Sequence, residues 1–329
     1  MRVIKGFVGL VIMVLLGAAL VLVLGPRQRF NLTEATKDQT PPRDISQITT
    51  DLAKSEARFT DIKPNQHKQI LWAGEEGAKT ALSIVYLHGF SASLQEIRPV
   101  PDNLGAALGA NVYFPRLTGH GRAGDAMAQT HVQDWAVDLA QALQIGQLIG
   151  QRVIVISAST GGTLATTLLD DPSLTEQVAG MIFVSPNFAV HNSMAFLGKL
   201  PLFNLWGPML GGETRSWEPS NTLHGQYWTT SYPTESIVPM MRLIDHVEGI
   251  DVARTEIPAL FYFSDDDRVV DAAATRQVAQ KWGGAVTLIN PTLTEADDVN
   301  AHVIAGDIMS PNQTATATAE MLNWIKSLE

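Results

Sequence analysis

Short runs of apolar residues alternate with helix-like patterns along most of the chain, and no other feature of the sequence constrains the fold as strongly. The runs are rich in Val, Ile, Phe and Tyr, which is typical of parallel strands covered by helices on both faces. Between them, apolar residues recur at the three- and four-residue spacing of a helix, as in residues 132–143. This alternation predicts an α/β fold with a mostly parallel sheet and helices on both faces. The predicted strands are residues 70–73, 81–87, 111–114, 153–156, 181–184, 259–263 and 285–289.

The first 29 residues do not follow this pattern. Residues 6–25 form an uncharged run of 20 residues, almost all of them Val, Leu, Ile, Met, Phe, Ala or Gly. As a helix, the run would measure about 30 Å, the thickness of the hydrocarbon core of a bilayer. A cleaved signal peptide is the alternative, but its apolar region is usually only about 7–15 residues long. The sequence therefore predicts that residues 1–29 are an uncleaved anchor with one N-terminal transmembrane helix.

Positive charges flank the apolar run almost evenly, with Arg2 and Lys5 before it and Arg27 and Arg29 after it. Positively charged residues tend to stay on the cytoplasmic side of a membrane, and the terminal amine adds one more charge before the run. The prediction is a single-pass membrane protein whose globular part lies on the non-cytoplasmic side.

The rest of the chain divides into two parts. Residues 30–61 are polar with little periodicity, which predicts a tether with one helix around residues 45–57. Residues 62–329 carry the strand and helix patterns and are predicted to form one α/β domain. Within this domain, about residues 187–254 show no convincing strand, and an insertion of that length is more often functional than a plain loop.

The insertion is rich in Trp and Met and holds three of the seven Trp residues. Ligands of open α/β sheets bind beyond the carboxyl ends of the strands. We therefore expect the insertion to form a helical cap over a substrate, with Trp206, Met209 and Trp228 in contact with it. The alternative is a helical excursion whose apolar residues only pack on the domain.

Composition excludes several classes of function. The chain has 33 acidic and 23 basic residues and a net charge of -10, which argues against a nucleic-acid partner. It has no Cys, so disulfides, thiolate nucleophiles and Cys-based metal sites are ruled out. The consecutive carboxylates of Asp265, Asp266 and Asp267 do not have the spacing of a calcium loop. We therefore predict no metal and no cofactor.

Ser159 is the candidate nucleophile. It follows a predicted strand in the run Ser157-Ala158-Ser159-Thr160-Gly161-Gly162, and a helical pattern begins directly after it. A Ser on such a sharp strand-to-helix turn has an exposed Oγ near the positive end of the helix. The turn needs small residues two positions before and after the Ser: Gly161 fits, and Ser157 replaces the usual Gly. Taken alone, a purely structural Ser turn explains the motif equally well.

Two later residues complete a Ser…Asp…His order along the chain. Asp267 ends the acidic run after the strand 259–263, and Asp265 is the alternative. His302 lies in a loop after the last predicted strand. This order differs from that of the other serine-triad folds. His88 precedes Ser159, which is out of order, so we predict a structural role for it.

A second loop could stabilise negative charge near Ser159. Tyr86-Leu87-His88-Gly89-Phe90 ends an earlier strand, and Gly89 allows the backbone to turn there. Such a loop can aim the Phe90 N–H at a carbonyl oxygen, and the Thr160 N–H would be the second donor of an oxyanion hole.

With these motifs, the chain from about residue 70 to its end resembles the α/β-hydrolase superfamily, particularly the capped serine esterases and the monoacylglycerol-lipase-like branch. The resemblance implies an α/β-hydrolase fold with Ser159 as nucleophile, Asp267 and His302 as its partners, and Phe90 and Thr160 as oxyanion donors. Ser264 replaces the Gly that commonly precedes the acid, which leaves the choice among the three Asp residues open. The matching pieces are His88-Gly89-Phe90, Thr118-Gly119-His120-Gly121 with Trp135 and Asp138, Ser157-x-Ser159-x-Gly161, Ser264-x-x-Asp267 and His302-Val303.

The sequence thus predicts a serine hydrolase of the carboxylesterase or lipase type that works through an acyl-enzyme. An apolar cap suits an acyl chain, and an anchor would hold the enzyme near lipid, so a small acyl or lipid-like ester is the expected partner. The same groups could act on a lactone, a thioester, an amide or a carbon–carbon bond. A non-catalytic, membrane-tethered binding scaffold is the alternative from another class.

Overall fold

Seven strands form one sheet in the computed structural model, which describes residues 2–38, 42 and 44–328. The spatial order is β1-β3-β2-β4-β5-β8-β9, in which β1 is antiparallel to β3 and the other neighbours are parallel. The predicted α/β fold with a mostly parallel sheet is therefore confirmed. The strands of the sheet are β1 Gln69–Leu71, β2 Thr80–Leu87, β3 Asn111–Phe114, β4 Gly150–Ala158, β5 Val178–Val184, β8 Ala259–Tyr262 and β9 Val286–Ile289.

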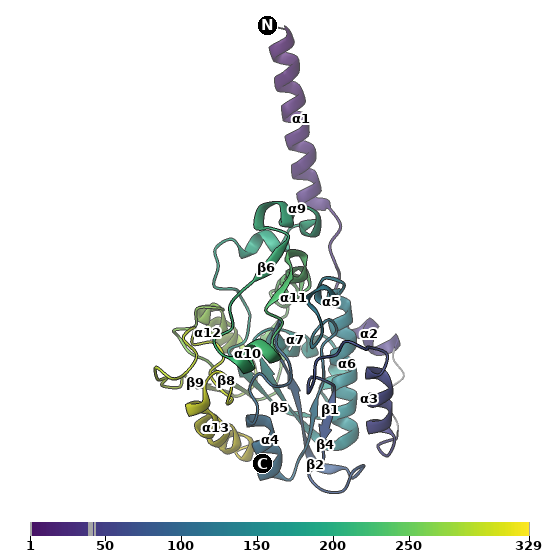
Figure 1. Cartoon of the computed structure of the whole chain (residues 1–329), viewed down its shortest axis with the longest axis vertical. Helices are drawn as coiled ribbons and strands as arrows, with labels where there is room; N and C mark the ends of the chain where they lie inside the picture. The colour runs from purple at the N-terminus through teal and green to yellow at the C-terminus, as the bar shows by residue number, and fades with distance from the viewer. Residues whose placement is uncertain (1, 39–41, 43, 329) are drawn as a thin grey trace.

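Helices cover both faces of the sheet (Figure 1). Alternate residues of β4 point to opposite faces: Val153 and Val155 belong to the core on the side of α6, α7 and α12, whereas Ile154 and Ile156 belong to the core on the side of α4 and α13. Both faces of the central strands are thus buried, which explains why their sequences are apolar throughout. The helices of the domain outside the insertion are α4 Val100–Leu108, α5 Gly124–Ala128, α6 Val132–Ile149, α7 Thr160–Thr166, α8 Pro172–Thr175, α12 Ala272–Lys281 and α13 Thr314–Lys326.

The insertion between β5 and β8 lies at the end of the sheet where the strands finish (Figure 1). It contains α9 (Phe203–Gly211), α10 (Thr222–Tyr227) and α11 (Val238–Val247). It also contains two strands, β6 (Thr214–Ser216) and β7 (Ser231–Pro233), which pair antiparallel. The sequence showed no strand here because three residues are too few to show a two-residue periodicity.

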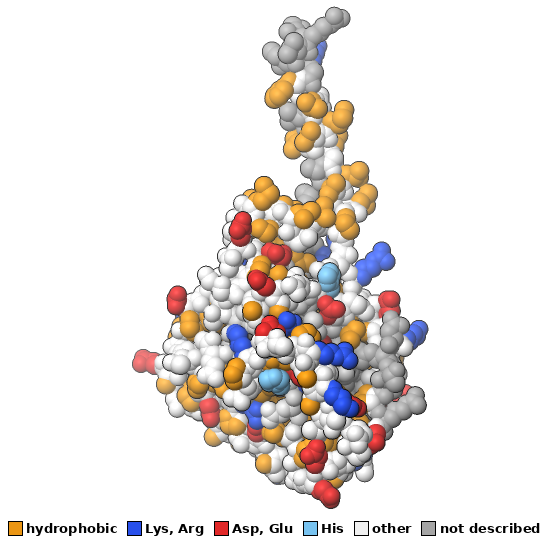
Figure 2. Space-filling view, turned by 45° about the vertical axis from the view of Figure 1, so that its right-hand side comes forward, with side chains coloured by type: hydrophobic (Ala, Val, Ile, Leu, Met, Phe, Trp, Pro, Cys, Tyr) orange, Lys and Arg blue, Asp and Glu red, His pale blue; other side chains and the backbone are white. Residues whose placement is uncertain are grey.

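Residues Arg2–Leu24 form helix α1, which projects from the insertion end of the molecule (Figure 1). Hydrophobic side chains are exposed along it and over the adjoining end of the globule (Figure 2). Within the described residues, however, no helix is both long enough and apolar enough to cross a membrane. A span needs about 20 apolar residues in succession, and no described helix meets this requirement. The predicted transmembrane helix is therefore wrong, and so is the predicted single-pass membrane localisation with a non-cytoplasmic globule.

The segment predicted as a polar tether holds helices α2 (Leu32–Asp38) and α3 (Ile48–Glu56). Leu32 and Leu52 are among its side chains that are buried against the domain. Residues 39–41 and 43, which also belong to the predicted tether, lie outside the described part of the chain. The division into residues 1–29, 30–61 and 62–329 stays a prediction.

Candidate active site

Ser159 occupies the turn between β4 and α7 in a strained backbone conformation. Its φ is +49° and its ψ is -120°, a region that a residue with a side chain rarely adopts. Three backbone hydrogen bonds hold it there: its N–H donates to the Val184 carbonyl, and its own carbonyl accepts from the N–H groups of Gly162 and Asn187, each at 2.9 Å. The turn therefore presents the Ser159 side chain at the carboxyl end of the central strand.

The small residues around Ser159 have separate physical reasons. A Cβ on Gly161 would stand 2.2 Å from the Leu87 carbonyl oxygen, so no other residue fits without moving β2. Ser157 is fully buried, and its hydroxyl donates to the Ile182 carbonyl at 3.1 Å. Ser157 is thus a structural residue of the sheet, and Ser159 is the hydroxyl that faces the cavity.

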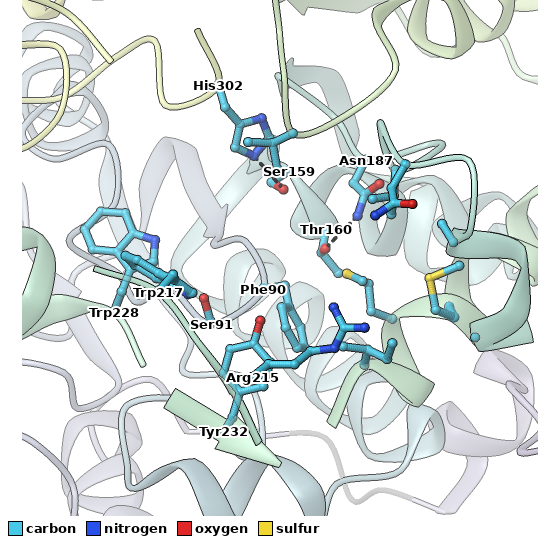
Figure 3. A pocket seen from close by; sticks show the side chains of 18 of the residues that line it. Phe90, Ser91, Ser159, Thr160, Asn187, Arg215, Trp217, Trp228, Tyr232 and His302 are labelled. Atoms are coloured by element: carbon cyan, nitrogen blue, oxygen red, sulfur yellow. Dashed lines mark hydrogen bonds between the residues drawn. The ribbon is translucent and has the colours of Figure 1, made fainter. Parts of the chain in front are cut away.

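A chain of two hydrogen bonds connects Ser159, His302 and Asp267. Figure 3 shows the bond between Ser159 and His302. His302 Nε2 is 3.0 Å from Ser159 Oγ, and His302 Nδ1 is 2.8 Å from Asp267 Oδ2. Because a carboxylate only accepts, Nδ1 carries the proton and Nε2 is left to accept one from Ser159. The other oxygen of Asp267 accepts the N–H groups of Val269 and Val270, at 2.8 and 2.9 Å, which fixes the carboxylate.

The environment of His302 favours its charged form. Burial by itself lowers the pKa of His302, but the hydrogen bond and the charge of Asp267, together with the charges of Glu96 and Asp298, outweigh burial. The net result is a pKa raised above the ordinary 6.5. Asp298 also holds the loop, since its two oxygens accept the N–H groups of Asn300, His302 and Val303.

The other carboxylates of the acidic run point elsewhere. Asp265, the alternative to Asp267, is ion-paired with Arg276 and accepts from Asn290 at 2.8 Å. Asp266 is exposed, and its backbone N–H donates to Ser264 Oγ at 3.1 Å. Of the three Asp residues, the structure brings Asp267 alone to His302.

The two predicted oxyanion donors flank Ser159. Thr160 is the first residue of α7, so its N–H has no carbonyl one turn earlier in the helix. The Phe90 N–H makes no hydrogen bond to another described residue, and Phe90 lines the same cavity as Ser159. Asn187, which sequence reasoning missed, donates from Nδ2 to Thr160 Oγ1 at 3.3 Å, and its buried Oδ1 has no partner among the described groups.

Glu96 is a further residue of the site that sequence reasoning did not identify. Its Oε2 accepts the Gly89 N–H at 2.6 Å and the Tyr86 hydroxyl at 2.9 Å. Burial raises the pKa of Glu96, although the Gly89 N–H, the Tyr86 hydroxyl and the charge of His302 oppose this. No helix begins at Glu96, and its side chain turns back to the loop after β2.

His88 takes no part in the hydrogen-bonded group around Ser159. It is buried, and its Nε2 accepts the Leu117 N–H at 3.1 Å. Burial lowers the pKa of His88 to about 4, so the ring is neutral at ordinary pH. His88 therefore fastens the loop after β3 to the loop after β2.

A cavity of about 810 Å³ opens in front of Ser159 and beneath the insertion. Of the three residues predicted to contact substrate, Trp206 and Trp228 line the cavity, whereas Met209 does not and is 83% exposed. The helical period explains this: Trp206, Gly207 and Leu210 share the inner face of α9, and Met209 lies on the outer face. The apolar side chains that line the cavity include Phe90, Met194, Leu197, Phe203, Trp206, Leu210, Trp217, Trp228, Met240, Met241 and Val269.

Within the described residues, no three His, Asp or Glu side chains are arranged to hold a metal ion. The Asp, Glu and Arg residues that line the cavity come from separate parts of the chain. They are Glu96, Arg215, Glu218 and Asp298.

Comparison with known proteins places this fold and site in context. The family model described as "Alpha/beta hydrolase family" matches residues 84–306. Among solved structures, a study of LipS and LipT, two metagenome-derived lipolytic enzymes, gives a TM-score of 0.64 at 19% identity and covers 81% of this chain and 99% of that chain. Monoacylglycerol lipase of Paleococcus ferrophilus gives a TM-score of 0.55 at 13% identity and covers 80% of this chain and 99% of that chain. A soluble variant of monoglyceride lipase from Saccharomyces cerevisiae gives a TM-score of 0.56 at 12% identity and covers 80% of this chain and 91% of that chain.

The comparison with curated proteins found no match. At these sequence identities, the solved structures show that the fold is shared. The substrates named for them apply to those proteins.

Proposed function

This chain belongs to the alpha/beta hydrolase family, and from that premise we propose that it is a serine hydrolase that cleaves carboxylic esters. Ser159 is the nucleophile, His302 the general base and acid, and Asp267 the residue that orients His302. One observation carries the proposal: His302 lies between Ser159 Oγ at 3.0 Å and Asp267 Oδ2 at 2.8 Å, at the floor of an apolar cavity.

The first half of the reaction forms an acyl-enzyme. His302 Nε2 accepts the hydroxyl proton while Ser159 Oγ bonds to the ester carbonyl carbon. The carbonyl oxygen becomes an oxyanion, which the N–H groups of Phe90 and Thr160 stabilise by about 3–4 kcal/mol for each donor. The tetrahedral intermediate then breaks its bond to the alcohol oxygen, and His302 gives that oxygen its proton. The alcohol leaves, and the acyl group remains on Ser159.

The second half regenerates the enzyme. His302 accepts a proton from a water molecule as the water oxygen attacks the acyl carbon. The bond to Ser159 Oγ breaks, and His302 returns the proton to Oγ. The charge of Asp267 stabilises the imidazolium that forms in both halves.

The lining of the cavity supports esters with an acyl chain. A cavity of about 810 Å³ with many aromatic and Met side chains can bury a flexible apolar chain, because Met adapts to irregular shapes. We propose an acyl or lipid-like ester as the substrate, in line with the lipases named among the structural neighbours.

The test is hydrolysis of p-nitrophenyl esters from two to twelve acyl carbons, roughly the range that such a cavity can hold, by the full chain and by Ser159→Ala. We expect turnover by the wild type, loss of turnover in the variant, and covalent labelling of Ser159 by a fluorophosphonate. Equal turnover by both proteins, or labelling at another residue, would contradict the assignment of Ser159. No turnover of any ester would contradict the proposed reaction.

A further inference from the structure

Arg215 lies in the insertion, where it is exposed to solvent and is also one of the residues that line the cavity. It is the middle residue of β6, and its Cα partner on β7 is Tyr232. Both side chains line the cavity, where they lie next to Phe90 in Figure 3. Arg215 is the one Lys or Arg among the described residues that line it. The cavity thus has a single permanent positive charge.

The Arg215 guanidinium has no protein partner. It makes no hydrogen bond and no ion pair with any residue in the described part of the chain, although five other Arg side chains are each ion-paired with a carboxylate. Nη2 of Arg215 lies 3.8 Å from the point where a Cβ on Gly211 would stand, so the glycine leaves room around the guanidinium. The paired side chains are Arg98, Arg116, Arg122, Arg242 and Arg276.

Two of the three carboxylates around the cavity are already satisfied. Glu96 accepts from Gly89 and Tyr86, and Asp298 accepts from three backbone N–H groups. Glu218 is exposed and is not within ion-pair distance of Arg215. The guanidinium is therefore available to a ligand, with five N–H donors in a planar fork that matches a carboxylate.

A chain of contacts connects Arg215 to the reacting centre. The ring of Tyr232 packs edge-on against the ring of Phe90 at 5.4 Å between centroids. Phe90 follows Gly89, and a Cβ on Gly89 would stand 3.0 Å from Ser159 Cβ. Tyr232 is partly buried, and this burial raises its pKa, although the nearby charge of Arg215 partly offsets the effect. Its hydroxyl makes no hydrogen bond to another described residue, so it too can serve as a donor.

We propose that Arg215, with the hydroxyl of Tyr232, forms a subsite for a carboxylate on the substrate. The preferred substrates are then esters that carry a carboxylate away from the scissile bond, in the acyl or the alcohol part. A monoanion suits a site with one cation and several carboxylates nearby better than a phosphate dianion does. This inference rests on the proposed ester hydrolysis and names the substrate class of the same site.

The experiment compares anionic and neutral substrates of matched length on the full chain. On the acyl side, p-nitrophenyl half-esters of dicarboxylic acids are compared with p-nitrophenyl esters of the matching fatty acids. On the alcohol side, butyrate esters of ω-hydroxy acids are compared with butyrate esters of the matching alcohols. The measured quantity is the ratio of kcat/KM for the anionic substrate to that for the neutral one.

We expect Arg215→Gln to lower this ratio about tenfold in one of the two arms, because a charged hydrogen bond at an open site is worth roughly that much. Most of the change should fall on KM, since the subsite binds substrate and transition state alike. Arg215→Lys should be intermediate, because it keeps the charge and loses the fork. Glu218→Gln should raise the ratio slightly.

Arg152→Gln is the matched control. Arg152 is exposed near the start of β4, at the opposite end of the strand from Ser159, so its loss changes the net charge and not the cavity. If Arg215→Gln leaves the ratio unchanged in both arms while Ser159-dependent hydrolysis of neutral esters persists, the carboxylate subsite is refuted and the proposed function stands. If the wild type hydrolyses neither class of ester, the proposed function is what fails, and the subsite fails with it.

Discussion

The backbone N–H of Gly89 donates a hydrogen bond of 2.6 Å to Oε2 of Glu96, a carboxylate buried beside Ser159. Gly89 precedes Phe90, whose N–H is a proposed oxyanion donor. Glu96 also accepts the hydroxyl of Tyr86 on β2, so it connects the loop to the rigid sheet. We infer that Glu96 is a positioning residue, which holds the Phe90 N–H in the direction that the reaction needs.

Removal of this carboxylate should lower kcat more than it raises KM. For Glu96→Ala we expect kcat to fall about 10- to 100-fold, the value of a hydrogen bond to a charged group. Glu96→Gln keeps an oxygen that can accept from Gly89, so it should recover much of the loss. Steady-state kinetics on one neutral ester measures both effects, with the thermal midpoint as a check of folding. If both variants lose kcat equally, the role of the acceptor is contradicted.

The activity should rise with pH through the ionisation of His302. Below its pKa the ring is protonated and cannot accept the proton of Ser159, so kcat/KM is low. Because that pKa is raised, the midpoint of the acid limb should lie above 6.5. In Asp267→Asn the largest stabiliser of the charged ring is lost, so the midpoint should move to lower pH while kcat falls about 10⁴-fold. A pH profile with an unchanged midpoint would contradict this account of His302.

Sequence patterns predicted the strands and turns whose formation depends on neighbouring residues. The strands and the positions of Ser159 and His302 follow from apolar runs and from the turns that end them, and these depend on neighbours in sequence. The buried face of α9 could not be predicted, because in a nine-residue helix the packing partners determine which face is buried. Met209 was chosen for its type and lies on the exposed face.

Glu96 and Arg215 were missed for a different reason. Glu96 is a site residue because its side chain folds back seven positions to Gly89, and no periodicity marks such a contact. Arg215 lies on a strand of three residues that has no pattern of its own. It is one of three Arg residues in the insertion, with Arg242 and Arg254, and what sets it apart depends on the pairing of β6 with β7.

The buried ion pair between Glu56 and Arg116 should be needed for stability. Glu56 Oε1 is 2.8 Å from Arg116 Nη2, and the pair joins α3 to the loop after β3. Glu56→Leu leaves a buried guanidinium without its partner, which should lower the free energy of unfolding by about 3 kcal/mol. Urea unfolding measures the difference. The double variant Glu56→Leu/Arg116→Leu should be no less stable than the single one, because it removes both charges.

The effect of Glu56 should also depend on pH. Burial raises the pKa of Glu56, but the hydrogen bond and charge of Arg116, with the N–H and charge of Lys68, lower it below the ordinary 4.5. Because the pKa of Glu56 is lower in the folded state, the ion pair stabilises the fold fully above about pH 4.5. This stabilisation is lost as the pH falls through the pKa of Glu56 in the folded state. The difference in unfolding free energy between the wild type and Glu56→Gln should therefore shrink below pH 4.5. A constant difference would contradict the charge-based explanation.

The turn at Ser159 should tolerate no side chain at Gly161. A Cβ there would stand 2.2 Å from the Leu87 carbonyl oxygen and 2.8 Å from that of His88, and both are backbone atoms that cannot move aside cheaply. Gly161→Ala should therefore lower the free energy of unfolding by about 3 kcal/mol and displace Ser159, with loss of fluorophosphonate labelling. Gly74→Ala is the matched control, because a Cβ on Gly74 would meet no described atom within 4 Å. If both variants unfold at the wild-type urea concentration and label equally, the steric account of the turn is refuted.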